Sequence, residues 1–98
     1  MTLTLLDLHC LNALCDDYEN VASVTADVRR SAHGNVSENE IRKCLAELKS
    51  KGWASVYEFD SSRSEYRRFD CLTEDWSNIW FLITDDGRKK LDQNWVDA

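Results

Sequence analysis

Residues 37–53 read SENEIRKCLAELKSKGW, and this stretch decides the fold. It opens with the S-x-x-E capping box, in which a serine and a glutamate satisfy each other's free backbone amides at the start of a helix. Apolar residues at helical spacing then predict one buried face, formed by Ile41, Cys44, Leu45 and Leu48. Lys49 and Lys51 supply a basic last turn and Gly52 a left-handed cap, so the helix should end there.

Two further helices are predicted upstream. Leu8, Leu11 and Tyr18 share one face of an amphipathic pattern over residues 4–18, which the acidic residues at its end help to terminate. A short extended piece at residues 21–23 should follow. The second helix is then expected over residues 24–32, closed by Gly34.

Downstream of Gly52 the pattern changes from helical to alternating. Residues 53–59, 66–72 and 79–84 are rich in β-branched and aromatic side chains and predict strands of a small antiparallel sheet. The polar turns between these strands are long enough to project. A closing helix should begin at Thr84 or Asp85 and run to about Trp95, which makes the fold class α+β.

The length of 98 residues suits one domain over residues 1–98, since a chain this short closes about one hydrophobic core. A hydrophobic content of 43% argues against disorder. No apolar run approaches the ~20 residues that span a bilayer, and the first residues lack a secretory signal. A cytoplasmic protein with no membrane contact is therefore expected.

The four cysteines, Cys10, Cys15, Cys44 and Cys71, form no CxxC pair, and the two histidines lie in different segments. Reduced thiols that pack as small hydrophobes are expected, with no metal site and no cofactor. No glycine-rich phosphate loop, GxSxG turn or HExxH helix occurs, so the chain is not expected to be an enzyme.

The net charge of −6 argues against a nucleic-acid partner, because a polyanion repels an acidic body. The charge is unevenly distributed, however. Residues 1–28 contain no lysine or arginine, whereas residues 29–51 hold six basic residues against three acidic ones. The region around the helix at 38–50 is therefore locally positive.

Two motifs in this order of elements carry a resemblance to a known family. LKSKGW at residues 48–53 and ITDDGRKKL at residues 83–91 resemble the winged helix-turn-helix superfamily, particularly the MarR and PadR type of bacterial regulator. In that family the first pattern ends the recognition helix and enters the wing, and the second leaves the wing. The resemblance covers nearly the whole chain. It implies a three-helix core with a small antiparallel wing and a short C-terminal helix, in a transcriptional regulator that binds double-stranded DNA.

The helix that begins at Ser37 should enter the major groove, whose width matches a helix. Asn39, Arg42 and Lys43 fall on or near its outer face, where asparagine could read adenine and the basic residues guanine. Ser37 sits at the end whose backbone amides attract phosphate. The alternative to a DNA-reading role is that these residues only form the solvent-exposed face of an amphipathic helix. Glu38 and Glu47 on the same helix would also repel phosphate.

For further basic residues, the sequence allows either DNA contact or pairing with acids of the protein. Arg63, Arg67 and Arg68 suit a wing that reaches the backbone or a minor groove, or they pair across the strands with acids, which the sequence favours slightly for Arg68. Arg29 and Arg30 could contact phosphates or bridge to nearby acids. If all of these cations face one way, binding should fall steeply with salt.

The rival function is a winged-helix interaction module that binds another protein and no DNA. The acidic body favours it, and Trp76 and Trp95 are candidates for exposed partner contacts. A homodimer is also expected, with its surface at the apolar ends formed by residues 2–6 and 91–96.

Overall fold

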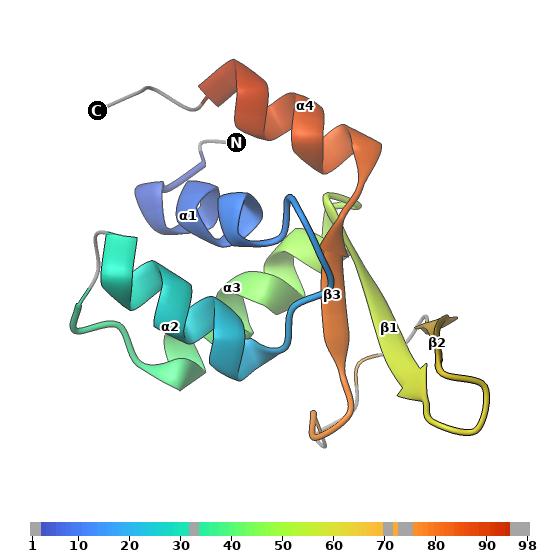
Figure 1. Ribbon diagram of the computed structural model, residues 1–98. Helices are drawn as coiled ribbons and strands as arrows, with labels where there is room; N and C mark the ends of the chain where they lie inside the picture. Colours follow the sequence, from blue (N-terminus) through green and yellow to red (C-terminus); the bar gives the residue numbers. More distant parts are fainter. Residues whose placement is uncertain (1–2, 32–33, 70–71, 73–75, 95–98) are drawn as a thin grey trace.

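The computed structural model describes residues 3–31, 34–69, 72 and 76–94. The helices and strands, in chain order, are α1 (Leu5–Ala13), α2 (Val21–Ser31), α3 (Glu38–Ser50), β1 (Ala54–Asp60), β2 (Glu65–Phe69), β3 (Trp80–Ile83) and α4 (Asp85–Asn94). Helices α1, α2 and α3 pack together on one side of the strands, and α4 lies across α1 at one end of the molecule (Figure 1). The α+β architecture predicted from the sequence is confirmed.

The sheet has the strand order β2-β1-β3, and both pairings are antiparallel. Val56 of the central strand lies opposite Phe69 on one side and Phe81 on the other. Glu19, in the connection between α1 and α2, adds a bridge to the outer edge of β3 through two backbone hydrogen bonds with Phe81, of 2.9 and 2.8 Å. The helix layer is therefore joined to the sheet by main chain as well as by side chains.

The core lies between the sheet and the three helices. Its largest fully buried side chains come from both layers and include Leu11, Leu14, Val24, Ile41, Leu45, Leu48, Val56 and Phe81. Cys10 and Cys44 are buried among them, as expected, but the Cys44 thiol also donates a hydrogen bond of 3.0 Å to Asp7 Oδ1. Hydrogen bonding with Cys10, burial and Asp7 raise the pKa of Cys44, so this thiol stays protonated and structural.

Helix α1 is shorter than the predicted 4–18. Thr4 caps it through a reciprocal pair of hydrogen bonds with Asp7, and it ends at Ala13, with Leu14 as its C-cap. The Leu14 carbonyl accepts from the Ile83 amide of β3. Beyond it, Tyr18 stacks on Tyr66 of β2 with ring centroids 3.8 Å apart. These tertiary contacts redirect the chain where periodicity alone continued the helix.

Helix α2 begins at Val21, so the predictions of an extended piece at residues 21–23 and of a helix start at residue 24 were wrong. Asn20 Oδ1 accepts from the Ser23 amide at 2.8 Å, and this side-chain hydrogen bond starts the helix early. The extended segment lies instead at Glu19, where it bridges to β3.

Helix α3 matches its prediction. Ser37 Oγ accepts from the Glu40 amide at 3.2 Å, and Glu40 Oε1 accepts from the Ser37 amide at 3.4 Å, which completes the capping box. At the other end Gly52 has φ of 78°, the left-handed conformation that terminates helices.

The strands and the last helix are confirmed with shifted limits. Strand β2 covers Glu65–Phe69 rather than residues 66–72, and Cys71 lies outside the described residues. Thr84 Oγ1 accepts from the Gly87 amide at 3.0 Å and caps α4, which is described up to Asn94. Within the described ranges, no helix is long and apolar enough to cross a membrane.

Gly87 is required where α4 approaches the start of β1. A Cβ atom there would lie 2.0 Å from the Trp53 carbonyl oxygen and 2.9 Å from Ile83 Cγ1. Gly87→Ala should therefore lower the free energy of unfolding by about 1–3 kcal/mol, despite the better helix propensity of alanine. Urea denaturation followed by circular dichroism measures this change. Gly34→Ala is the matched control, since its Cβ would come no closer than 4.0 Å to the Arg29 carbonyl. Equal stability of the two variants would contradict the packing argument.

Candidate nucleic-acid interface

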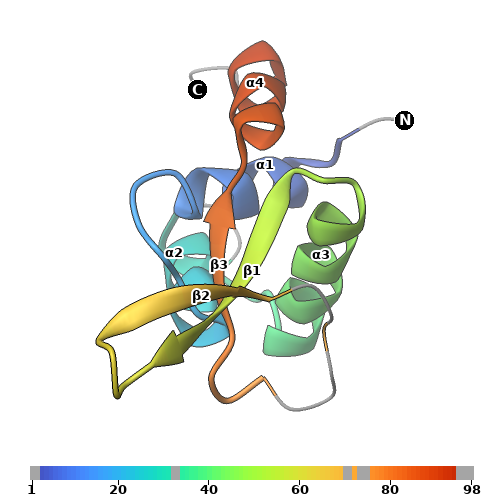
Figure 2. The ribbon, with the colours of Figure 1, turned by 90° about the vertical axis from the view of Figure 1, so that its right-hand side faces the viewer.

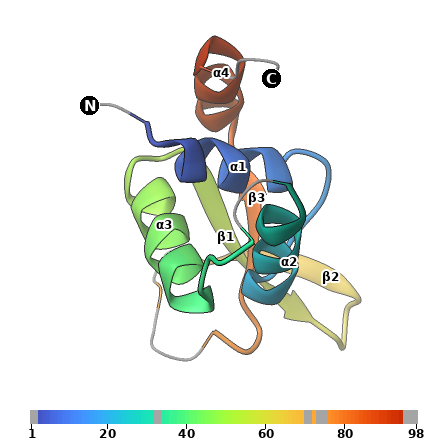
Figure 3. The ribbon, with the colours of Figure 1, turned by 90° about the vertical axis from the view of Figure 1, so that its left-hand side faces the viewer.

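Helix α3 presents one polar face to solvent and buries the opposite face in the core. Asn39 and Lys43 are exposed on the outer face, and Ala46 is half-buried there. The N-terminal end of α3, the turn between β1 and β2 and the chain that leads into β3 lie at the same end of the molecule, opposite α4 (Figures 2 and 3). A duplex approaching this end would meet helix and hairpin together.

Arg42 does not project freely from that face. Its guanidinium pairs with Glu38 at 3.5 Å and lies over the Trp76 ring, 5.3 Å from the ring centroid. Its Nε is buried and has no hydrogen-bond partner among the described residues. Arg42 must therefore leave Glu38 or Trp76 before it can reach a base in the major groove.

Asn39 and Lys43 are the predicted α3 residues that remain available. Each is exposed, and neither makes a side-chain hydrogen bond or ion pair within the described ranges. Lys43 lines a shallow cavity of about 230 Å³ that also contains Glu40 and Glu47. Ser37 is occupied as the N-cap, since its hydroxyl accepts from the Glu40 amide.

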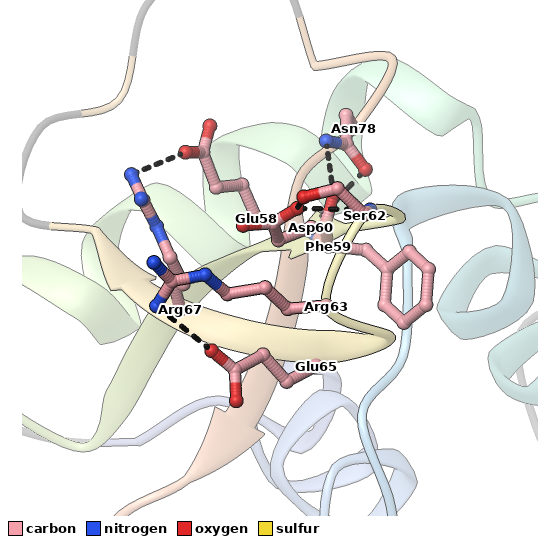
Figure 4. Close-up of polar contacts among 8 residues, drawn as sticks. All are labelled: Glu58, Phe59, Asp60, Ser62, Arg63, Glu65, Arg67 and Asn78. Carbon is pink, nitrogen blue, oxygen red and sulfur yellow. Dashed lines mark hydrogen bonds and ion pairs between the residues drawn. The ribbon is translucent and has the colours of Figure 1, made fainter.

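Two of the three wing arginines are paired with acids on the hairpin (Figure 4). Arg67 lies directly opposite Glu58 and contacts it at 3.2 Å, and Arg63 lies 3.9 Å from Glu65. The cross-strand pairing that the sequence favoured for Arg68 is thus formed by Arg67. Arg68 stands opposite Tyr57 and makes no ion pair with any described residue.

The hairpin turn that carries Arg63 is held by Asp60. Its carboxylate accepts from the Ser62 amide at 3.0 Å and from the Ser62 hydroxyl at 2.6 Å. The hydrogen bond from the Ser62 side chain is the main reason that the pKa of Asp60 is lowered. These hydrogen bonds hold the turn together, and Arg63 is exposed on it.

Arg29 and Arg30 have partners within the helical layer. Arg29 Nε donates to the Val36 carbonyl at 2.9 Å and braces the connection between α2 and α3. Arg30 pairs with Asp27 at 2.6 Å, although 76% of its side chain remains exposed. Arg30 thus bridges to an acid, as one of the two predicted alternatives holds, whereas Arg29 bonds to a backbone carbonyl rather than to an acid. Phosphate contact would require both residues to exchange partners.

Several cations that form no ion pair with a described carboxylate lie where α3 ends. Lys49 and Arg68 line a common cavity. Lys51 and Lys90 lie over the Trp53 ring, at 5.2 and 5.6 Å from its centroid. The sequence identified Lys49 and Lys51 only as a basic last turn of the helix, because their neighbours on β2 and α4 are set by the tertiary fold.

A cavity of about 410 Å³ between α1 and α2 is lined by polar residues that include His9, Asp16, Glu19 and Asp27. Burial, followed by the charge of Asp27, raises the pKa of Glu19. Within the described ranges, no group of three or more His, Cys, Asp or Glu side chains is arranged to hold a metal ion.

The fold has a counterpart among solved structures. A PadR-like transcriptional regulator from Bacillus cereus superposes with a TM-score of 0.67 over 91% of this chain and 76% of that chain, at 17% sequence identity. No protein-family model matches the sequence, and no curated protein is significantly similar to it. The chain therefore has the winged-helix fold that its sequence resembles.

The raised pKa of Glu19 makes stability depend on pH in a defined direction. A folded-state pKa above the ordinary 4.5 means that ionised Glu19 costs stability above the folded pKa, and this cost vanishes below the unfolded pKa. Glu19→Gln should thus be more stable than the wild type at pH 7, with a gap that closes as the pH falls below about 4.5. Thermal denaturation between pH 3 and 8 measures the gap.

The control for this experiment is Glu47→Gln, an exposed position on α3 that should change stability by no more than about 0.5 kcal/mol. If the stabilities of Glu19→Gln and the wild type changed in parallel with pH, the pKa of Glu19 would not be raised by folding, and the prediction would be wrong.

Proposed function

We propose that this chain is a DNA-binding transcriptional regulator that inserts α3 into the major groove and sets the β1–β2 hairpin beside it. The observation that carries this proposal is the division of α3 into two faces. Ile41, Leu45 and Leu48 are fully buried, so the helix is anchored, while Asn39 and Lys43 are exposed and unpaired within the described ranges. An anchored helix with polar residues facing outward is what reading base edges requires.

The acids of α3 weigh less against DNA than their number suggests. Glu40 is held in the capping box, and Glu38 is paired with Arg42. Glu47 remains exposed without an ion pair in the described part of the chain. Other acids, including Asp16 and Asp27, line the cavity between α1 and α2, to which no described residue of α3 contributes.

A homodimer completes the proposal. Leu5 is 57% exposed, and Leu3 and Leu6 are half-buried against the core beside it. These leucines lie at the start of α1, the helix that α4 packs against (Figure 1). A second copy that covers this apolar end would leave α3 and the hairpin, at the other end, free for DNA.

A second candidate function is a protein-interaction module that reads no DNA. The pairing of the arginines favours it, since Arg30, Arg42, Arg63 and Arg67 each already contact a carboxylate. Each of these side chains would have to exchange an internal partner for a phosphate. The half-buried Trp76, which carries Arg42 on its ring, is then a candidate partner contact.

The DNA-binding proposal is tested with a duplex enriched from a random library. Lys43→Ala should weaken binding by about 1–3 kcal/mol and relax specificity at one base pair, because a base contact is lost. Glu47→Gln should strengthen binding to every sequence, because an exposed acid on the same helix is removed. Fluorescence anisotropy at several salt concentrations measures both effects.

Lys89→Ala removes the same charge from the exposed face of α4 and should leave the affinity unchanged. Undetectable duplex binding by the folded wild type at low salt would reject the regulator and leave the interaction module. Loss of a captured protein partner on Trp76→Ala would then support that second function.

A further inference from the structure

A small cavity lies between the last turn of α3 and the β1–β2 hairpin. Its volume is about 100 Å³, and its lining includes Lys49 from α3, Ser55 from β1 and Arg68 from β2. Figure 2 shows these three elements side by side, with β2 crossing in front of β1. Three segments that are separate in sequence thus supply polar side chains to one place.

Among the residues that the structure describes, the cavity is lined by two cations and by no carboxylate. Three further cavities, between α1 and α2, beside the start of α1 and beside Trp76, each contain at least one acid, such as Asp27, Glu47 or Glu38. Neither Lys49 nor Arg68 makes an ion pair with a described residue. Two positive charges without a neutralising partner favour an anion at this position.

The hydrogen-bonding groups suit an oxyanion. An arginine presents donors in a planar fork that matches two oxygens, and a lysine adds up to three more donors. Ser55 is buried, and its hydroxyl makes no hydrogen bond within the described ranges, so it can donate to the same ligand. Thr84, which also lines the cavity, uses its hydroxyl to donate to the Gly52 carbonyl at 2.7 Å and so supports the wall.

The size of the cavity limits the ligand. About 100 Å³ is roughly three times the ~30 Å³ that a water molecule occupies in the liquid. Drug-sized ligands and nucleotides need cavities of about 300–1,000 Å³. A single tetrahedral oxyanion is therefore the class of ligand that fits.

We propose that Lys49, Arg68 and Ser55 bind one phosphate group. The phosphate belongs either to the backbone of a DNA duplex or to free inorganic phosphate, because both present the same oxygens to these donors. The DNA source rests on the proposed function, whereas the anion site itself does not. The negative end of the α3 dipole opposes an anion here, so binding of the free ion should be weak, in the millimolar range.

The first arm of the test uses inorganic phosphate alone. Amide resonances of residues 52–56 and 68–69 are followed by two-dimensional NMR as phosphate replaces chloride at constant ionic strength. The wild type should show saturable shifts, and Lys49→Gln/Arg68→Gln should raise the apparent Kd about tenfold or more. Lys49→Gln and Arg68→Gln are also measured singly against Lys89→Gln, which removes one positive charge from the exposed face of α4. Circular dichroism verifies folding. Absence of saturable shifts in the wild type, or equal shifts in the double variant, overturns the proposal.

The second arm identifies the source of the phosphate. If it belongs to DNA, the double variant should weaken binding of unrelated duplexes alike and reduce the slope of log K against log salt by about one, because one phosphate contact is lost. Unchanged duplex binding, with the phosphate shifts lost, supports the site with free phosphate as its ligand. A wild type that binds no duplex refutes the proposed function, while the first arm still decides the site.

Discussion

The arrangement of the whole molecule depends on the backbone pairing of Glu19 with Phe81. The two hydrogen bonds join the connection between α1 and α2 to the free edge of β3, and they occur beside Phe81, whose side chain is fully buried. Glu19 directly precedes Asn20, whose side chain accepts from the Ser23 amide in the first turn of α2, so the pairing lies next to the start of that helix. An exposed strand edge is also covered, which removes a site of unwanted pairing. The helix layer is thus held against the sheet by main-chain hydrogen bonds as well as by the side chains of the core.

Local signals in the sequence predicted the elements but not all of their ends. The capping box at Ser37 is a start signal and the glycine at position 52 is a stop signal, and α3 matches the prediction that both gave. Periodicity extended the first helix to Tyr18, because nothing local shows that this ring stacks on Tyr66. The limits of α3 could therefore be predicted from local signals, whereas the end of α1 is set by tertiary contacts. The start of α2 was predicted wrongly, although Asn20 accepts a local hydrogen bond from the Ser23 amide.

The candidate interface was predicted in part for the same reason. Exposure of Asn39 and Lys43 follows from their place on the helix, and helical periodicity is enough to find them. The pairing of Arg67 with Glu58 depends on strand register, which the turn at Asp60 to Ser62 sets. Composition counts every arginine as a positive charge available to a ligand. The structure shows that most of the arginines predicted to bind DNA already form ion pairs or hydrogen bonds within the protein.

The internal pairing of these arginines limits the number of cations that can bind DNA phosphates. Sequence-independent affinity grows with the number of phosphates that cations neutralise, and its salt dependence is close to −0.9 per contact. With the arginines at 30, 42, 63 and 67 internally paired, few unpaired cations face a duplex. The non-specific term must then be small, and an acidic body reduces it further. Affinity for the correct site would have to come from the fit of α3 to the groove and from doubling of contacts in a symmetric dimer, so such a regulator would discriminate strongly between sites while binding each half-site weakly.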